Sequence, residues 1–233
     1  MRVLGLIPAR GGSKGFPRKN LHPVHGRPLL ALTIDAAHAA SRLSRVILST
    51  DDAEIASAGL ALGAEVPFMR PAGLAADHSP TLPVIQHALR FCDEAGDRYD
   101  AVCLLQPTSP MRTAADIDAC VDLLESSGAD SVFSMLAVPH HYNPHWVFEP
   151  DGTGWLRLAT GEEKIVPRRQ ELPAAYHRDG SIYITRRQTL LEGDSLYGAR
   201  IRGYLMSYGT TPVNIDGPED IGLLERALAR GTS

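Results

Sequence analysis

The sequence predicts an α/β fold with a doubly wound, mostly parallel sheet. Short apolar runs alternate with amphipathic runs along the first two thirds of the chain. This alternation is typical of strand–helix units, which pair their strands in parallel and cover both faces of the sheet with helices. After about Val138 the pattern changes to turn residues that surround both tryptophans, which predicts a small inserted, hairpin-like lobe over 139–170. We therefore expect a single domain over 1–233 that carries one insertion.

Each element is predicted from its apolar pattern and from the signals at its ends. Strands are expected at 3–9, 45–49, 65–69, 101–105, 131–136, 181–185 and 203–208. Helices are expected at 28–40, 53–62, 82–95, 114–126 and 218–230. Helix start signals are Asp51 or Asp52, then Thr81, then Thr113 with Asp116, and finally Pro218, with Gly231 as the stop signal of the last helix.

Composition and charge bound the class of protein. The chain has 233 residues, of which 44% are hydrophobic and 21% are charged, as in ordinary globular proteins. A net charge of −4 argues against bulk binding of nucleic acid, so the cations near the N-terminus form a local patch. The cysteines lack metal or disulfide spacing, and the chain shows neither a membrane-spanning apolar run nor a signal peptide. We expect a cytoplasmic protein that binds neither membrane nor nucleic acid.

The loop after the first strand, residues 7–20, carries the strongest functional signal. It holds three glycines, one serine and four cations within eleven residues. Backbone N–H groups in such a loop can approach an anion, and open α/β sheets bind ligands at this end of a strand. The cations are Arg10, Lys14, Arg18 and Lys19. A solvated basic turn is the alternative, but the position and chemistry favour a polyphosphate ligand.

The spacing in this loop excludes the two best-known phosphate loops. Its lysines are not followed by a hydroxyl residue in the register of a Walker A motif, and Gly11 and Gly12 are adjacent where the dinucleotide fingerprint needs an intervening residue. A P-loop ATPase and a nicotinamide dehydrogenase are therefore disfavoured.

Polar residues also follow two later strands. Asp51 and Asp52 come directly after the second strand; a helix cap explains at least one of them, and the functional alternative places Asp51 near a nucleotide. Two prolines fix the turn after the strand at 101–105. Its polar side chains are Gln106, Thr108, Ser109 and Arg112. A buried strand does not need such a cluster of polar side chains at its end, so a contact with a ligand is favoured over a plain loop.

Two segments nearer the C-terminus each allow two interpretations. Arg168 and Arg169 offer planar forks for a carboxylate, and a surface salt-bridge network is the alternative. Asn214 and Asp216 lie on one face of an extended segment, where both can offer oxygens to a hard cation. Alternatively, Asp216 caps the last helix. Histidines between 140 and 145 lack cysteine or carboxylate partners at ligand spacing, which disfavours zinc.

Seven motifs spread over nearly the whole chain carry a resemblance to one family. In chain order they are Ile7-Pro8-Ala9-Arg10-Gly11-Gly12-Ser13-Lys14-Gly15 with Pro17, Lys19 and Asn20; Ser49-Thr50-Asp51; Arg70-Pro71 with Leu74-Ala75 and Asp77; Leu105-Gln106-Pro107-Thr108-Ser109-Pro110 with Arg112; Arg169-Gln170 with Leu172-Pro173; Gly180-Ser181-Ile182-Tyr183-Ile184; and Ile215-Asp216 with Asp220. Together they resemble the acylneuraminate cytidylyltransferases, the CMP-sialic acid synthetase family. The first motif combined with the Gln-Pro-Thr-Ser-Pro turn is specific.

The resemblance implies a Rossmann-like nucleotide-sugar transferase that uses CTP and Mg²⁺. Arg10 and Lys19 are implied to hold the CTP phosphates and, with Asp216, to be catalytic. Further nucleotide contacts are implied for Gly11, Gly12, Ser13, Lys14, Asn20, Arg70 and Asp77. Gln106 is implied to contact the sugar acid or the nucleotide, Arg169 the sugar, and Asp216 the Mg²⁺ at the α-phosphate. The resemblance also implies a homodimer in which the inserted lobe reaches the partner's active site.

Two positions depart from the pattern of this family. The family commonly has Asp-x-Asp at the metal position, where this chain has Asn214 before Asp216. One ligand charge is lost, although the amide still offers an oxygen. His177, followed by Arg178, stands where sialic acid activators have an arginine that contacts the sugar. The sugar therefore stays open among sialic, legionaminic and pseudaminic acid.

These expectations define one reaction and its competitors. The anomeric hydroxyl of a nine-carbon acid sugar attacks the α-phosphorus of CTP in line, pyrophosphate leaves and the CMP-sugar forms. One competitor is a cytidylyltransferase or guanylyltransferase for another acid sugar such as 3-deoxy-octulosonate. The other is a catalytically inactive, nucleotide-binding regulatory module, which the missing carboxylate at Asn214 would suit.

Overall fold

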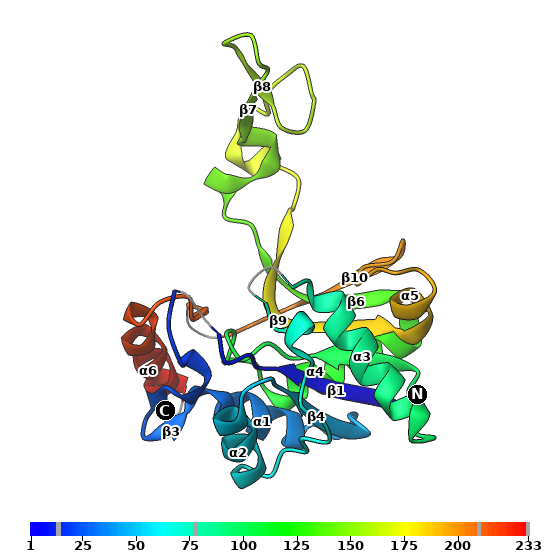
Figure 1. The fold of residues 1–233 in the computed structure, drawn as a ribbon. Coiled ribbons are helices and arrows are strands. Elements are labelled where there is room, and N and C mark those ends of the chain that lie inside the picture. The colour runs from blue at the N-terminus through cyan, green and yellow to red at the C-terminus, as the bar shows by residue number, and fades with distance from the viewer. Residues whose placement is uncertain (13–14, 77–78, 209–210, 232–233) are drawn as a thin grey trace. The chain divides into compact units, whose positions relative to one another are not determined.

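The computed structural model describes residues 1–12, 15–76, 79–208 and 211–231, and it divides into two units (Figure 1). The larger unit consists of Met1–Ser134 and Asp179–Ser233, and the second unit is Met135–Arg178. The second unit encloses the range 139–170 that the sequence predicts as an insertion. The site candidates therefore divide between a sheet-bearing unit and the insertion.

The larger unit is built on a six-stranded sheet in the order β10-β6-β9-β5-β1-β4. Its strands are β1 (Val3–Pro8), β4 (Arg45–Ser49), β5 (Ala101–Leu104), β6 (Ser131–Ala137), β9 (Tyr176–Arg186) and β10 (Ile201–Leu205). β1 pairs in parallel with β4 and with β5, and β9 runs antiparallel to β5. The carboxyl ends of β1, β4 and β5 therefore meet at one edge of the sheet, where ligands bind in folds of this kind.

Helices cover both faces of this sheet, as the sequence predicts. They are α1 (Leu29–Ala39), α2 (Ala53–Ala61), α3 (Thr81–Glu94), α4 (Ala114–Ser127), α5 (Arg187–Leu191) and α6 (Glu219–Gly231). Side chains of α1, α2 and α4 form one apolar cluster with Val3 and Ile7 of β1. Leu4 and Leu6 point to the opposite face, because side chains alternate along a strand, and both are fully buried. α3 packs on β1 and on α5.

Short elements complete the two units. The larger unit has the hairpin β2 (Pro23–Val24) and β3 (Arg27–Pro28), and the second unit has the hairpin β7 (Phe148–Pro150) and β8 (Leu156–Leu158). The 3-10 helices are η1 (Lys19–Leu21), η2 (Ala72–Leu74), η3 (His140–Tyr142), η4 (Pro144–Trp146) and η5 (Arg169–Glu171). No helix in the described ranges is both long enough and apolar enough to span a membrane.

Two of the predicted helix starts are confirmed in atomic detail. The Asp52 carboxylate accepts hydrogen bonds from the backbone N–H groups of Glu54 and Ile55, at 2.8 and 3.0 Å, and so caps α2. Thr113 and Asp116 form a capping box at α4, in which each side chain accepts a hydrogen bond from the backbone N–H of the other.

Several predicted boundaries are wrong. The strand expected at 65–69 is reduced to isolated bridges at Glu65 and Met69, because Pro67 has no N–H to donate to a ladder. Thr81 is the first residue of α3 and does not cap it. The last helix begins at Glu219, one residue after Pro218, and the glycine expected beyond its end lies in its last turn.

Candidate active site

A cavity of about 370 Å³ lies at the edge where β1 and β5 end. Pro8, the last residue of β1, lines it together with Pro107 of the turn after β5. The cavity brings together Arg10, Lys19, Asn20, Arg70 and Gln106, all of which the sequence analysis singles out. Among the described residues that line the cavity there are three cations and no carboxylate. This arrangement suits a polyanion.

The loop after β1 is held at its start by the segment that follows β4. The backbone N–H of Gly11 donates to the Asp51 carboxylate at 3.1 Å, so Asp51 positions the loop. A Cβ at Gly11 would lie 2.5 Å from the Asp52 carboxylate oxygen, which explains why glycine is needed there. Asn20 donates from its amide to the Arg10 carbonyl at 3.2 Å and closes the loop from its other end.

The cations of this loop have different surroundings. The Arg10 guanidinium donates to the Ala76 carbonyl at 3.0 Å, across the cavity mouth. The Lys19 ammonium donates to the Ile215 carbonyl at 2.5 Å, and burial lowers the pKa of Lys19 although Asp216 and Asp220 oppose that shift.

Arg18 differs from its neighbour, because its exposed guanidinium pairs with Glu54 at the start of α2. The expectation that all four loop cations face one anion is therefore wrong for Arg18. Ser13 and Lys14 lie outside the described residues, as does Asp77.

Arg70 is buried, with 6% of its surface exposed, at the side of the cavity nearest β4. Its Nε donates to the Ser49 hydroxyl at 3.1 Å, and a second guanidinium nitrogen donates to the Ser49 carbonyl. Burial lowers the pKa of Arg70, while the nearby Asp51 carboxylate favours its charged form. The structure thus fixes this cation against the end of a strand before any ligand binds.

The turn after β5 is held from beneath by Arg112. This guanidinium is buried and donates to the carbonyl of Ser109 at 2.6 Å, to that of Ser181 at 2.8 Å and to the Thr33 hydroxyl at 2.9 Å. A further bond reaches the Gln106 carbonyl. Burial lowers the pKa of Arg112 to about 10. Arg112 therefore shapes the turn, of which Gln106, Pro107 and Thr108 line the cavity.

The segment before α6 joins this turn and the loop after β1. The backbone N–H of Ile215 donates to the Thr108 carbonyl at 2.8 Å. The N–H groups of Asp216 and Gly217 donate to the Asp220 carboxylate at 2.8 and 2.9 Å, so the cap of this segment is Asp220. These backbone bonds lower the pKa of Asp220. The Asp216 carboxylate is exposed and lies within electrostatic reach of Lys19.

The donor set beside the cavity fits a divalent metal only with help from a substrate. Within the described ranges, no cluster of three or more His, Cys, Asp or Glu side chains could hold a metal ion. Asp216 offers a carboxylate, and Asn214 offers an amide oxygen that already accepts a bond from the Ser109 hydroxyl at 2.6 Å. Mg²⁺ is typically bound by one or two carboxylates together with substrate phosphates, so these residues suit it.

The two other residues predicted to contact the sugar, Arg169 and His177, lie on the second unit. Arg169 begins η5 and is exposed, and its neighbour Arg168 pairs with Glu171 at 3.6 Å. His177 is exposed on β9, with its Nδ1 at 3.1 Å from the Arg178 carbonyl oxygen. Both predicted sugar contacts are thus accessible side chains of the inserted unit.

The sequence assigned no role to two residues that shape the site. Gly180 has φ of 91°, and a Cβ there would lie 2.9 Å from the Ser109 hydroxyl oxygen. Asp179, beside it, is 6% exposed. The Asp-Gly pair was a local signal for a special backbone position, and the structure places it inside β9, with partners that are distant in sequence.

Comparisons with known proteins agree on one family. Residues 4–212 match the family described as Cytidylyltransferase. The CMP-N,N'-diacetyllegionaminic acid synthase of Legionella pneumophila is 34% identical over 98% of this chain and 97% of its own length. The pseudaminic acid cytidylyltransferase of Campylobacter jejuni is 31% identical over 84% of each chain. A solved CMP:2-keto-3-deoxy-manno-octonic acid synthetase complexed with CTP has the same fold, with a TM-score of 0.74 and 19% identity over 99% of this chain and all of that one.

Proposed function

This chain belongs to the cytidylyltransferase family, and we propose that it transfers CMP from CTP to a nine-carbon acid sugar of the sialic, legionaminic or pseudaminic type. The relatives named above are synthases of this kind, and they support the proposed sugar class. The single observation that carries the proposal is the cavity at the sheet edge, which gathers Arg10, Lys19, Arg70 and Gln106 around one space.

In this proposal the loop after β1 holds the triphosphate. Arg10 and Lys19 neutralise the phosphates, and the loop backbone at Gly11 and Gly12 lies close to them, with the Gly11 N–H bonded to Asp51 and the Gly12 N–H available to a phosphate oxygen. Lys19 is well prepared for this task, because its ammonium is tethered to the Ile215 carbonyl beside Asp216. Ser13, Lys14 and Asn20 complete the nucleotide-binding loop. Arg70 and Asp77 are proposed to contact the cytidine.

We assign a Mg²⁺ ion to Asp216, with the amide oxygen of Asn214 as its neighbour. The bound metal would supply a Lewis acid that neutralises charge on the phosphates. Asn214 would contribute no charge to the metal, so the negatively charged ligands would be the Asp216 carboxylate and the substrate phosphates. This makes Asp216, Arg10 and Lys19 the catalytic residues of the proposal.

The chain's own contribution to the reaction is positioning and charge neutralisation. The transfer passes through a state with the attacking and leaving oxygens in line, so the protein has little covalent chemistry to perform. Arg10 and Lys19 stabilise the negative charge that accumulates on the departing pyrophosphate. Gln106 can both donate to and accept from the sugar acid, and so orients it toward the α-phosphorus.

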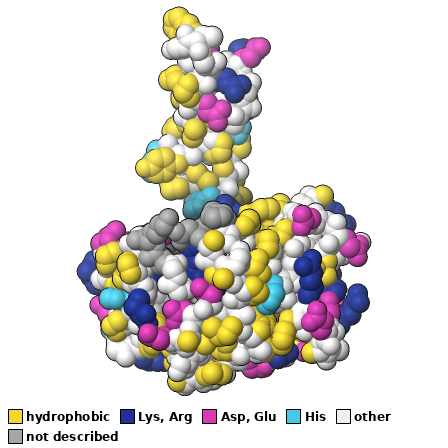
Figure 2. Space-filling view, in the orientation of Figure 1, with side chains coloured by type: hydrophobic (Ala, Val, Ile, Leu, Met, Phe, Trp, Pro, Cys, Tyr) yellow, Lys and Arg dark blue, Asp and Glu magenta, His cyan; other side chains and the backbone are white. Residues whose placement is uncertain are grey.

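The second unit is proposed to select the sugar and to form a homodimer. Arg169 and His177 would contact the carboxylate or the acyl groups of the sugar. Large hydrophobic side chains lie exposed on this unit (Figure 2), namely Tyr142, Val147, Phe148, Trp155, Leu156, Ile165 and Tyr176. Exposed apolar surface of this extent is typical of a protein interface. We place the enzyme in the cytoplasm, where CTP is available.

Pyrophosphate release tests the function directly. Purified protein is given one nucleoside triphosphate, one acid sugar and Mg²⁺, with Asp216→Ala as the inactive background. We expect release only with CTP and one nine-carbon acid sugar. Release with 3-deoxy-octulosonate or with GTP supports a synthase for another acid sugar. Binding of CTP without release in any combination contradicts the transfer and favours a regulatory module.

A further inference from the structure

A buried carboxylate, that of Asp179, lies where the larger unit resumes after the insertion. One of its oxygens accepts hydrogen bonds from the Ser134 hydroxyl and from the Ser181 N–H, the latter at 3.1 Å. The other oxygen accepts from the phenol of Tyr208. Burial, together with the bond to Asp179, raises the pKa of Tyr208, so the phenol remains a donor at neutral pH. Three donors therefore surround a carboxylate that is only 6% exposed.

These hydrogen bonds connect the two strands, β6 and β9, at the residues where the chain leaves the larger unit and returns to it. Ser134 is the last residue of the larger unit on β6, and Asp179 is its first residue on β9. The Ser134 hydroxyl oxygen also accepts from the Ile182 N–H at 2.8 Å, so the pairing of the two strands is reinforced by side chains. His177, a proposed sugar contact, comes two residues before Asp179 in the chain.

The backbone at the same position reaches the proposed metal and sugar residues. The Asp179 carbonyl accepts from the Asn214 amide nitrogen at 3.4 Å, while the Asn214 amide oxygen accepts from the Ser109 hydroxyl at 2.6 Å. Gly180 approaches the same hydroxyl, and a Cβ at Gly180 would lie 4.0 Å from the Gln106 amide oxygen. The start of β9 thus sets the orientation of Asn214 and packs beside Gln106.

Charge gives Asp179 a second role. The buried guanidinium of Arg112 holds the turn that carries Gln106, and its four acceptors, three carbonyls and one hydroxyl, are uncharged. The negative charge of Asp179 favours the charged form of Arg112 against the cost of burial. This long-range attraction adds to the three hydrogen bonds that the carboxylate accepts directly.

We propose that Asp179 is a positioning residue of the transfer reaction. Its carboxylate, held by Ser134, Ser181 and Tyr208, fixes the backbone of residues 179–180, and this backbone keeps Gln106 and Asn214 in place. The proposal rests on the function proposed above, in which these two residues serve the sugar and the metal. It predicts that Asp179 acts on the chemical step more than on CTP binding, because Arg10 and Lys19 are not among its contacts in the described structure.

The test compares Asp179→Asn with Tyr208→Phe. The asparagine keeps the shape of the side chain and an acceptor for Ser134, but it removes the negative charge and one of the two carboxylate oxygens that accept hydrogen bonds. We expect kcat to fall about 10- to 100-fold, the size of a positioning error, while the Kd for CTP measured by calorimetry stays unchanged. Tyr208→Phe keeps the charge and removes one donor, so its kcat is expected to fall by only a few-fold.

Asp118→Asn is the matched control. Its carboxylate also accepts three hydrogen bonds, from the N–H and hydroxyl of Ser41 and from the N–H of Arg42, and it belongs to α4. This variant is expected to lose stability and to keep kcat. An Asp179→Asn protein with wild-type kcat overturns the proposal, as does one whose kcat and CTP affinity fall together in proportion to unfolding. A wild type that binds CTP without releasing pyrophosphate contradicts the proposed function itself, and the positioning role with it.

Discussion

At the scale of single residues, two neighbouring cations of the loop after β1 face different partners. Arg18 has a left-handed backbone conformation, with φ of 59°, and its guanidinium pairs with Glu54 on the surface. Lys19 turns to the other side, lines the cavity and donates to the Ile215 carbonyl. Adjacent residues of like charge are therefore expected to differ in their effect on catalysis.

We predict that Lys19→Ala lowers kcat/KM for CTP by an amount that corresponds to about 2–4 kcal/mol of lost transition-state stabilisation, because a preorganised cation at the phosphates is removed. Arg18→Ala is the control, and it is expected to remain within about 1 kcal/mol of the wild type, because its ion pair is exposed. Initial rates of pyrophosphate release at limiting CTP measure both. Equal losses in the two variants would contradict the assignment of Lys19.

Acid titration tests the role of Asp220 as the cap of the segment before α6. Backbone N–H groups lower the folded-state pKa of this carboxyl below its usual range. Its contribution to stability is therefore fully present above the unfolded pKa and is lost as the pH falls through the folded value. We expect Asp220→Ala to be about 1 kcal/mol less stable than the wild type at pH 6.

Thermal unfolding of both proteins between pH 6 and pH 3 measures this dependence. The difference in Tm should shrink toward zero at the acid end. A difference that stays constant over the whole range would show that the Asp220 charge does not stabilise the segment.

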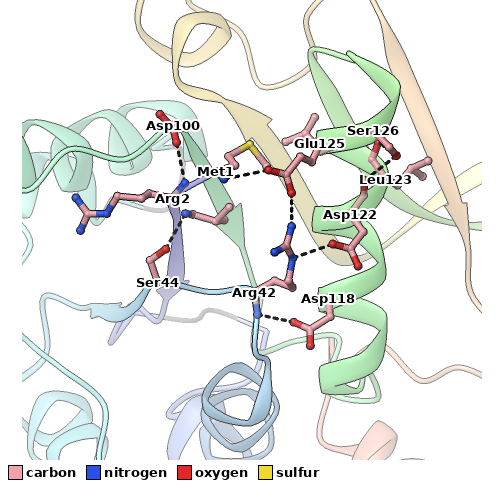
Figure 3. A network of polar contacts seen from close by, with 12 residues as sticks. Met1, Arg2, Arg42, Ser44, Asp100, Asp118, Asp122, Leu123, Glu125 and Ser126 are labelled. Atoms are coloured by element: carbon pink, nitrogen blue, oxygen red, sulfur yellow. Dashed lines mark hydrogen bonds and ion pairs between the residues drawn. The ribbon is translucent and has the colours of Figure 1, made fainter.

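At the scale of elements, α4 is joined to the loop between α1 and β4 by a network of carboxylates (Figure 3). Arg42 pairs with Asp122 at 2.8 Å and with Glu125, and the Asp118 carboxylate accepts from the Arg42 N–H at 2.8 Å. Glu125 also pairs with the amino group of Met1 at 3.0 Å. The Arg42 ion pairs are partly exposed and therefore contribute little to the free energy of unfolding. The hydrogen bonds from backbone N–H groups to Asp118 are expected to provide most of the stabilisation.

We therefore predict that Asp118→Ala lowers the free energy of unfolding by about 1–3 kcal/mol, because it leaves N–H groups of the loop without an acceptor. Catalytic constants should remain those of the wild type. Urea denaturation and pyrophosphate release, measured on the same preparation, test both parts. A loss of kcat without a loss of stability would contradict this structural role.

The alternating apolar pattern was enough to predict the helices and most strands of the sheet, because each element buries a face whose period the sequence displays. It failed at Pro67, where an apolar run reads as a strand but lacks the donor that a ladder needs. Residues of the N-terminal loop could be predicted from their chemistry. The Asp179 contacts could not, because Ser134 and Tyr208 lie far from it in sequence and no local pattern couples them.

At the scale of the whole molecule, the second unit exposes more apolar surface than a monomer needs. Trp155 is 77% exposed and Leu156 is 66% exposed, next to each other at the hairpin of this unit. We predict that the protein is a homodimer, as proposed above, and that changing both to serine converts it into a monomer, as measured by light scattering after size exclusion. Leu60→Ser on α2, where 59% of the leucine is exposed, is the matched control and should leave the dimer intact.

The proposed reaction of this chain joins CMP to an acid sugar and releases pyrophosphate. Phosphorus NMR of the protein with CTP, Mg²⁺ and a nine-carbon acid sugar tests it most directly. We expect the three CTP resonances to decline together while one phosphodiester resonance and pyrophosphate appear in equal amounts. Appearance of CDP with inorganic phosphate, or an unchanged CTP spectrum with every nine-carbon acid sugar, would contradict it.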